Sequence, residues 1–461
     1  MEKIWIRNGI FVDGSFSFKG EMIVAGGKIA EVGEALCKPD GEVTELDAGG
    51  NFVFPGGLDP HVHLELPTPA GPSSDDFLSG TRAALLGGTT SIIDFVTPSR
   101  EQSLPDAFIE RKAFAEKSLI DYTFHMGLSG WHPTSGDEMR QCVHDYGINS
   151  FKAYLAYRAT IGVDYTGLEN ILRSGQKLDS IICVHCEDGS LIQELQENFI
   201  KQGLTTPRYH ALSRPPMAEV SAVEEVIKLS AKTGCAVYLV HMSAAGSVTA
   251  IEKAKLKGLN ITAETCPQYL LLDESLYERP LPESLAYIMS PPLRQKTDRD
   301  RLWQGLQQQT IDVVSTDHCP FNIKGQKDIG LHDFTKVPNG GAGIQTRLSL
   351  LYTYGVCTGK ISMEKFVDLV SVAPARAFGL WPRKGSLLPG SDADLVIWDP
   401  GYRESITYSK LAQQCDHTPF EGLEVVGRPG TVICNGMIAV TNGQMSGAKL
   451  HGRFLARNVQ A

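Results

Sequence analysis

The sequence predicts an α/β fold: a (β/α)8 TIM-like barrel with a small β-sandwich domain formed from both chain termini. Three observations lead to this prediction. The chain has 461 residues, enough for a barrel of about 250 residues and an accessory domain. Its middle part alternates short apolar stretches with amphipathic helical ones, which is typical of a parallel sheet. Its two ends share β-type alternation and glycine turns instead.

The two ends, residues 1–55 and 381–445, are expected to form the small domain together. Both contain the alternation of apolar and polar residues that half-buried strands show. Asn8-Gly9 and Gly26-Gly27 indicate turns near the N-terminus. Asn435-Gly436 lies between two alternating apolar runs, which is a strong hairpin signal. We therefore expect short antiparallel strands and hairpins that bracket the middle of the chain.

Residues 56–380 are expected to form the barrel. The strand candidates, including the opening stretch that leads into this region, are residues 52–63, 91–95, 122–125, 150–155, 181–185, 237–241, 261–264 and 313–317. They are about as many as a closed (β/α) barrel needs. The remaining residues, 446–461, have no evident core role and are expected to form a C-terminal arm, with a disordered tail as the alternative.

Composition limits the classes of partner. The chain is 42% hydrophobic and 21% charged, as ordinary globular proteins are. A formal charge of −10 argues against nucleic acid or an anionic membrane as the main partner. Ten cysteines without a regular framework favour a reducing compartment. With no signal-peptide pattern at the first residues and no apolar run of about 20 residues, we expect a cytoplasmic protein without a membrane span.

Two histidines end the strand on which the barrel is organised, residues 52–63. Side chains two apart on a strand project from the same face, so His61 and His63 would aim two imidazoles at one point. Asp59 would stand behind them. Two imidazoles at the carboxyl end of a buried strand form half of a metal site. A His-x-His pair taken alone is more often a pair on a half-exposed edge.

Further polar residues lie on or near the ends of other predicted strands. Lys152 lies on the fourth, His185 closes the fifth, His241 the sixth and Asp317 the eighth. Each has an ordinary structural explanation, such as a satisfied core histidine or a paired buried lysine. In a barrel, however, functional groups gather at the carboxyl ends of the strands. Six residues of types that hold divalent metals, all at that face, favour a metal site.

These residues lie in motifs that resemble the amidohydrolase superfamily, and within it the hydantoinases and dihydropyrimidinases, most of all the bacterial phenylhydantoinases. The motifs are residues 59–63 (Asp-Pro-His-Val-His), 151–157 (Phe-Lys-Ala-Tyr-Leu-Ala-Tyr), 184–185, 240–241 and 316–320 (Thr-Asp-His-Cys-Pro). Residues 209–215, 264–269, 290–294, 338–340 and 379–385 extend the resemblance across nearly the whole chain.

The resemblance implies a centre with two divalent metal ions. Lys152 would be carbamylated by CO2 and bridge them, since a lysine buried near cations is favoured as the neutral amine. His61, His63 and Asp317 would hold one ion and His185 and His241 the other. Mixed imidazole and oxygen ligands suit zinc best, with manganese, iron or cobalt as alternatives.

The resemblance also implies the reaction and the residues that carry it. A hydroxide shared by the two metals would attack a ring carbonyl, and Asp317 would move the proton to the leaving nitrogen. Tyr157 would stabilise the oxyanion; without the resemblance we would interpret it as a barrel-rim aromatic. Ser290 and Asn339 match positions whose backbone groups hold the cyclic imide. Relatives form homotetramers, and some exchange C-terminal tails, a role that the arm from Gly447 onward would suit.

A neutral ring is the expected substrate. Relatives that open carboxylate-bearing rings, the dihydroorotases, carry an arginine two residues after the second metal histidine, where this chain has Glu65. We therefore expect hydrolysis of a 5-substituted hydantoin, such as phenylhydantoin, or of a dihydropyrimidine to an N-carbamoyl amino acid. The ring substituent should lie against residues 66–72 and 158–162. Allantoinase or another cyclic-amide hydrolase is an alternative, and a non-catalytic dihydropyrimidinase-like scaffold is an alternative of another class.

Overall fold

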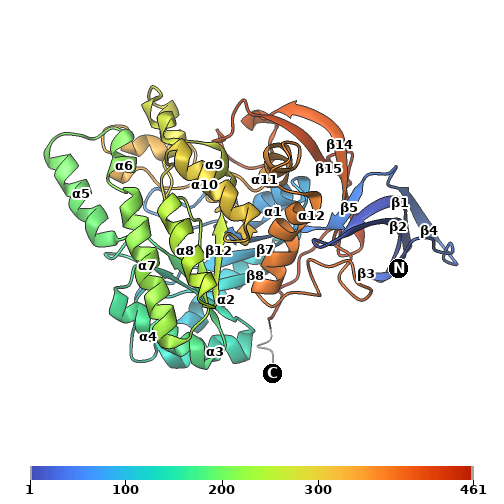
Figure 1. The fold of residues 1–461 in the computed structure, drawn as a ribbon, viewed down its shortest axis with the longest axis horizontal. Coiled ribbons are helices and arrows are strands. Elements are labelled where there is room, and N and C mark those ends of the chain that lie inside the picture. Colours follow the sequence, from blue (N-terminus) through green and yellow to red (C-terminus); the bar gives the residue numbers. More distant parts are fainter. Residues whose placement is uncertain (1–2, 458–461) are drawn as a thin grey trace.

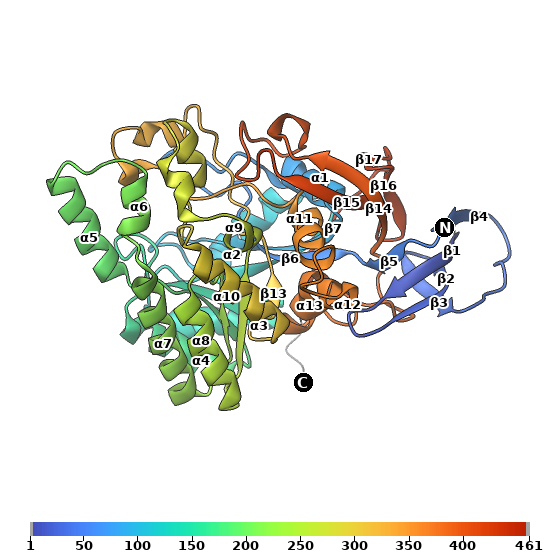
Figure 2. The ribbon, with the colours of Figure 1, turned by 45° about the horizontal axis from the view of Figure 1, so that its top comes forward.

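The computed structural model describes residues 3–457 and contains two sheets (Figure 1). The larger part of the chain winds around an eight-stranded parallel sheet, and the terminal segments form a nine-stranded sheet beside it. Figure 2 shows this second sheet on one side of the barrel, with helix α5 (Gly189–Lys201) at the other end of the molecule. No helix among residues 3–457 combines the length and the apolar character that crossing a membrane requires.

The eight-stranded sheet is the predicted barrel, which is thereby confirmed. Its strands pair side by side in sequence order. They are β6 (Gly57–Val62), β7 (Thr89–Val96), β8 (Asp121–Gly127), β9 (Ser150–Tyr154), β10 (Ile181–His185), β11 (Val237–Leu239), β12 (Ile261–Thr265) and β13 (Val313–Val314). The barrel closes just after the last strand, where His318 forms a parallel bridge with Val62. The His318 carbonyl accepts a 2.8 Å hydrogen bond from the His63 amide.

Helices follow the strands and cover the outside of the barrel. The longer ones are α1 (Phe77–Leu86), α2 (Leu104–Ala115), α3 (Ser135–Tyr146), α4 (Tyr165–Lys177), α5, α7 (Pro216–Thr233), α8 (Ala245–Leu256) and α10 (Lys296–Gln307). Aspartates cap several N-termini; Asp76, for example, accepts from the Ser79 amide in a capping box. Gly147 and Gly234 end α3 and α7 in the left-handed conformation that glycine adopts readily.

Short helical segments fill the connections above and below the barrel. The α-helical ones are α6 (Arg208–Leu212), α9 (Pro267–Leu271), α11 (Arg347–Leu351), α12 (Met363–Val367) and α13 (Ala373–Ala377). The others are η1 (Glu274–Glu278), η2 (Glu283–Tyr287), η3 (Lys327–Gly330), η4 (Phe334–Lys336), η5 (Tyr352–Val356), η6 (Asp368–Val372) and η7 (Tyr408–Lys410).

The stretch predicted as one strand over residues 52–63 is two strands in two different sheets. β5 (Phe52–Pro55) pairs with β1 and β14 of the terminal sheet, whereas β6 opens the barrel. Gly56 separates them at a close approach, because a Cβ there would lie 2.1 Å from the Thr90 hydroxyl oxygen. The chain therefore passes directly from the terminal sheet into the strand that carries the histidines.

The terminal sheet is continuous and mixed. Its strands are β1 (Lys3–Val12), β2 (Ser17–Ala25), β3 (Lys28–Gly33), β4 (Val43–Asp47), β5, β14 (Leu395–Ser405), β15 (Glu424–Cys434), β16 (Met437–Thr441) and β17 (Gln444–Met445). The predicted turns at Gly26-Gly27 and Asn435-Gly436 are confirmed as hairpins. Asn8-Gly9 is instead an irregularity within β1, and β1 runs parallel to β4 and β5. The expectation of antiparallel strands alone was therefore wrong.

The C-terminal segment packs on its own barrel. Phe454 bridges to Tyr122, and the Gly452 amide donates to the Ser118 carbonyl beside the start of β8. Leu455 joins an apolar cluster of barrel-lining residues. Arg457 is buried and donates to the Ser150 hydroxyl, at 2.9 Å, and to the Phe124 carbonyl. The expectation that this segment has no core role was wrong up to Arg457; residues 458–461 of the predicted arm lie outside the described residues.

Candidate metal centre and active site

Residues from the ends of β6 and β13 form the first cluster of metal-binding side chains. Nε2 of His61 lies 3.0 Å from Oδ1 of Asp317, and Nε2 of His63 lies 3.2 Å from the same oxygen. Ligand atoms of all three lie within 4.8 Å of one another. His61 and His63 thus converge as the alternation of a strand predicts, and Asp317 reaches them across the seam of the barrel.

Residues from β10 and from the end of β11 form the second cluster. Nδ1 of His185 and Nε2 of His241 lie 2.9 Å apart. The ring centroid of His241 is 5.4 Å from that of His61, so the two clusters adjoin. All four histidines are buried. Imidazole nitrogens from several strands therefore face one point. Such a set of donor atoms suits zinc and other divalent transition metals.

Lys152 lies inside the barrel without a hydrogen-bond partner on its amine among the described residues. It is 1% exposed, and its Nζ lies 4.8 Å from the ring centroid of Phe95 and 4.9 Å from that of Tyr154. Burial lowers the pKa of this lysine, which nearby anionic groups such as Asp317 only partly oppose. A buried amine with a lowered pKa is favoured as the neutral, nucleophilic form.

Two buried glutamates accept hydrogen bonds from two of the metal-site histidines. Glu264, at the end of β12, accepts from Nδ1 of His61, and its other oxygen accepts from the Tyr238 hydroxyl at 2.7 Å. Glu187 accepts from Nε2 of His185 at 2.8 Å. Such partners orient ligand histidines. The sequence analysis did not select either residue, although Glu264 ends a predicted strand and Glu187 lies two residues after His185.

The charged groups of the cluster shift one another's pKa values in opposite directions. Burial alone would lower the pKa of His61, but the carboxylates of Asp317 and Glu264 raise it to about 9. Burial lowers the pKa of His63 to about 4 against the attraction of Asp317. Burial would raise the pKa of Asp317, yet the neighbouring histidines hold it well below its usual range. Asp317 is therefore a carboxylate at neutral pH.

Three site residues have left-handed backbones that side chains other than glycine rarely adopt. The φ angles are 58° at Tyr157, 44° at His241 and 52° at Asp317. Such conformations cost about 1–3 kcal/mol each and persist only where the surroundings impose them. Three of the predicted site residues thus have backbone conformations that the surrounding structure must hold in place.

Tyr157 and Asn339, two of the predicted substrate-binding residues, lie together. The Asn339 amide donates to the Tyr157 hydroxyl at 3.4 Å. The Tyr157 ring is 5.6 Å from that of His185, between centroids. Ser290 is buried, and its hydroxyl has no partner among the described residues.

A lysine that the sequence analysis missed joins the two predicted substrate segments. Lys327 is fully buried, and burial lowers its pKa to about 8. Its amine donates to the Ile288 carbonyl at 2.9 Å and to the Pro338 carbonyl at 3.0 Å. The segments that carry Ser290 and Asn339 are therefore tied to one amine. No sequence signal identified Lys327, because its partners are backbone atoms distant along the chain.

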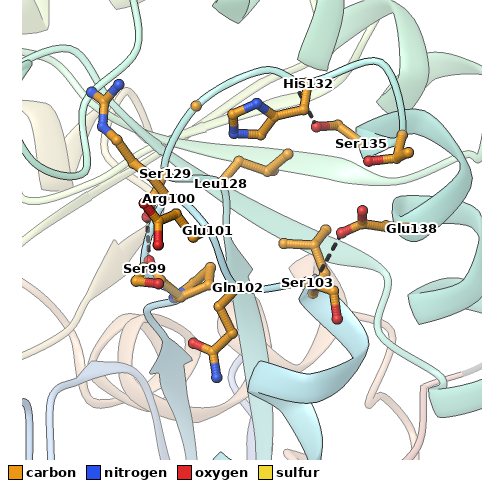
Figure 3. A pocket seen from close by; sticks show the side chains of 14 residues that line it. Ser99, Arg100, Glu101, Gln102, Ser103, Leu128, Ser129, His132, Ser135 and Glu138 are labelled. Carbon is orange, nitrogen blue, oxygen red and sulfur yellow. Dashed lines mark hydrogen bonds between the residues drawn. The ribbon is translucent and has the colours of Figure 1, made fainter.

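The loop that carries Tyr157 is held by an exposed arginine. Arg100 donates to the carbonyls of Thr160 (2.7 Å), Arg158 (2.5 Å) and Gly162 (3.2 Å). Figure 3 shows Arg100 beside Ser99 at the edge of a polar cavity of about 180 Å³, across from His132 and Ser135. Arg100 thus clamps the backbone on the C-terminal side of Tyr157.

A larger, mainly apolar cavity of about 520 Å³ lies between the loop that follows His63 and helix α2, and none of the metal-site residues lines it. Its lining includes Leu66, Pro67, Pro72 and Phe95, and the Phe95 ring stacks on that of His63 at 4.7 Å between centroids. Glu65 also lines it, and its carboxylate pairs with Lys117 at 3.1 Å. Phe95 is therefore the residue that connects this cavity to the metal-site histidines.

Comparisons with known proteins agree with this geometry. The sequence pattern of the amidohydrolase family matches residues 52–439. A D-hydantoinase of Geobacillus stearothermophilus is 40% identical over 98% of this chain and 96% of its own length. The chain belongs to the amidohydrolase family. The resemblance inferred from the motifs is thus confirmed, and this amidohydrolase is a hydrolase of the class that acts on cyclic amides.

Two further relatives extend the similarity of this amidohydrolase. A D-phenylhydantoinase of Escherichia coli O1:K1 is 38% identical over 99% of this chain and 98% of its own. The crystal structure of a dihydropyrimidinase from Brevibacillus agri superposes with a TM-score of 0.97, at 40% identity, over 100% of this chain and 99% of the other. The likeness covers the barrel and the terminal sheet alike.

Proposed function

We propose that this amidohydrolase opens the ring of a neutral cyclic imide or amide, a 5-substituted hydantoin or a dihydropyrimidine, to give an N-carbamoyl amino acid. One observation carries the proposal: the His61, His63 and Asp317 cluster adjoins the His185–His241 pair. Near both lies Lys152, whose amine has no hydrogen-bond partner in the described part of the chain. That the similar proteins are named D-hydantoinase, D-phenylhydantoinase and dihydropyrimidinase supports it.

The residues present fit two divalent metal ions. His61, His63 and Asp317 would hold one and His185 and His241 the other, with zinc favoured over manganese, iron or cobalt. The buried neutral amine of Lys152 would take up CO2 and bridge both ions as a carbamate. That no described residue offers this amine a hydrogen bond supports the role, because a buried amine otherwise needs a partner. When bound, the ions polarise a carbonyl and lower the pKa of water.

The chain's own groups would position the ring and move the proton. Asp317 is ionised and lies within 3.2 Å of two histidine nitrogens, so it can accept a proton and return it to the leaving nitrogen. Tyr157 would donate its hydroxyl hydrogen to the oxygen on which negative charge develops. Ser290 and Asn339 would offer backbone groups to the imide, and Lys327 ties their segments together.

The loop that follows His63 supports a substituted, uncharged ring. Leu66 and Pro67 of this loop, together with Phe95 against the His63 ring, are apolar side chains that would lie against an aryl or alkyl substituent. Glu65 stands where an arginine would bind a ring carboxylate, and its own carboxylate shares Lys117 with Asp76. The missing arginine therefore remains the argument against a carboxylate on the ring.

Assembly and location are proposed on separate grounds. A homotetramer is proposed from the resemblance, and Ile200, Leu212 and Met217, which are 38%, 45% and 63% exposed, are apolar side chains that a contact between subunits would cover. A cytoplasmic location is supported by the ten cysteines, all of which are free thiols.

The test is a turnover panel with metal analysis on the purified protein. The panel contains hydantoin, phenylhydantoin, dihydrouracil, allantoin and dihydroorotate. We expect a neutral imide to be opened at least about a hundredfold faster than dihydroorotate, since loss of a charged partner costs several kcal/mol. If allantoin or dihydroorotate were the fastest substrate of the panel, the proposed substrate class would be wrong. A protein that takes up no metal and opens no ring would be the scaffold instead.

A further inference from the structure

A buried arginine lies against the tyrosine of the site. Arg214, between α6 and α7, is 3% exposed, and its guanidinium carbon lies 5.4 Å from the ring centroid of Tyr157. Its carbonyl accepts from the Arg294 guanidinium. Its Nε has no hydrogen-bond partner among the described residues. The Arg214 guanidinium thus packs against the Tyr157 ring, while the Arg214 backbone is held by Arg294.

One carboxylate oxygen links this arginine to a metal-site histidine. Oε2 of Glu187 accepts from Nη1 of Arg214 at 2.5 Å and from Nε2 of His185 at 2.8 Å. The His185 ring in turn faces Tyr157. Arg214, Glu187, His185 and Tyr157 therefore form a closed group in which each member touches two others.

Stability alone gives no reason for this group. Burying an ion pair removes two charges from water, and apolar residues of similar volume are often as stable or more so. Glu187 is 0% exposed, so the desolvation is complete. A pair kept in this position, with one member on a metal-site histidine and the other on the tyrosine, suggests a role in the reaction.

We propose that Arg214 is a positioning residue for ring opening that acts through Tyr157, with its own guanidinium held in place by Glu187. It packs against the Tyr157 ring and so directs the phenol hydroxyl, which would stabilise the oxygen on which negative charge develops. The ion pair with Glu187 holds the guanidinium in this place. This inference rests on the proposed function.

The experiment is a double-mutant cycle on the full chain, saturated with zinc and assayed for phenylhydantoin opening. The variants are Arg214→Gln, Arg214→Lys and Tyr157→Phe, singly and combined. Arg214→Gln should lower kcat by about a hundredfold or more and raise KM by less than about threefold, as loss of transition-state stabilisation does. Arg214→Lys keeps the charge but not the fork, so it should recover about a tenth of the wild-type rate or more.

Coupling to Tyr157 separates this role from a structural one. In the Tyr157→Phe background, Arg214→Gln should cost less than about fivefold, because residues that act as a unit are not additive. If Arg214→Gln does not fold, the same cycle is run with Arg214→Lys, whose loss should also vanish beside Tyr157→Phe. The matched control is Arg208→Gln, which removes an exposed arginine paired with Glu278 and should change kcat by less than about twofold.

Each result decides the matter. Equal losses in both backgrounds, or a change confined to KM, would overturn the role of Arg214 while the proposed function stands. A wild-type chain that opens no member of the panel would overturn the proposed function and this inference with it. A loss of kcat that disappears in Tyr157→Phe, with Arg208→Gln unaffected, would establish it.

Discussion

The hydroxyl of Thr316 donates a hydrogen bond of 2.6 Å to the carboxylate of Asp59. Asp59 lies in β6, the first strand of the barrel, and Thr316 lies two residues after β13, the last strand, 257 positions along the chain. Oδ1 of the same aspartate accepts from the His61 amide at 3.2 Å. This bond across the barrel seam therefore adjoins the strand that carries the metal-site histidines.

Replacing Thr316 with valine should destabilise the barrel seam. Asp59 would lose the donor on a fully buried oxygen, which costs about 1–3 kcal/mol of unfolding free energy. Chemical denaturation measures the change. Thr123→Val is the control, since the hydroxyl of this buried threonine has no partner within residues 3–457 and its loss should be near neutral or stabilising. Equal effects of the two variants would contradict the assigned role of the Asp59 contact.

Lys152→Ala should lose metal and turnover together. Without the anionic bridge two cations would lie close together, so we expect the rate to fall by more than about two orders of magnitude. Acetate or propionate, supplied with excess metal, should occupy the space and restore part of the rate. Metal analysis and hydrolysis assays with and without the acid measure this. Full metal occupancy in the variant would count decisively against a bridging carbamate.

Lys327→Met should weaken substrate binding more than it slows the reacting step. The variant frees the carbonyls of Ile288 and Pro338, so the segments that would hold the imide lose their common tie. We expect KM to rise about tenfold, equivalent to about 1.4 kcal/mol. Lys324→Met, which removes a neighbouring exposed lysine, is the control. An unchanged KM in a folded Lys327→Met protein would exclude this role.

Arg100→Gln should slow turnover without unfolding the protein. The side chain is exposed, so its loss leaves the core intact, but three carbonyls of the loop after Tyr157 lose their donor. We expect kcat to fall about tenfold, with a melting temperature within about 2 °C of wild type, as for other surface changes. Arg140→Gln, which breaks an exposed pair on α3, should leave kcat unaltered. If Arg100→Gln and Arg140→Gln had the same kinetics, the proposed role of Arg100 in holding the loop after Tyr157 would be wrong.

Ion pairs lie where the barrel, the terminal sheet and the C-terminal segment meet. They should make the unfolding free energy fall at acidic pH. Lys384 contacts Asp121, Asp392 and Asp394 there. Burial would raise the pKa of Asp392, but Lys384 and Lys28 lower it to about 2. A lowered carboxyl pKa gives stability that is present above the unfolded value of about 3.9 and is lost as the pH falls toward 2.

The measurement is unfolding free energy between pH 7 and pH 2.5. Asp392→Asn should lower stability at pH 7 and flatten its loss between about pH 4 and pH 2.5, because the titrating group is gone. Asp300→Asn, at an exposed position, should leave the wild-type profile unchanged. If the unfolding free energy of Asp392→Asn fell with pH as steeply as that of wild type, Asp392 would not be a cause of the acid dependence.

Local pattern was enough to predict the barrel and the convergence of its histidines. Alternation along a strand places His61 and His63 on one face, and the carboxyl ends of parallel strands meet at one face of a barrel. Asn435-Gly436 forms the predicted hairpin for an equally local reason, since both residues adopt positive φ. These features depend on residues close together in the sequence.

The features that were missed depend on contacts between distant residues. Gly56 divides the opening stretch between two sheets because Thr90 occupies the space of a side chain. Glu187 and Lys327 gain their roles from partners on other elements, Arg214 among them. The tail carries no long apolar run, so nothing in its own residues showed that Arg457 enters the barrel. Periodicity cannot reveal such contacts, because it reports only which face a residue occupies.

The buried tail has a consequence for the order of folding during synthesis. Arg457 donates to the Ser150 hydroxyl, which lies 2.6 Å from Nδ1 of His125, and Nε2 of His125 lies 2.9 Å from the Pro60 carbonyl. The ribosome makes this arginine after every strand of the barrel. A nascent chain can therefore assemble its strands but not complete this polar path to β6 until the tail has emerged. The histidine strand would acquire its final support last, although it is among the first parts to be made.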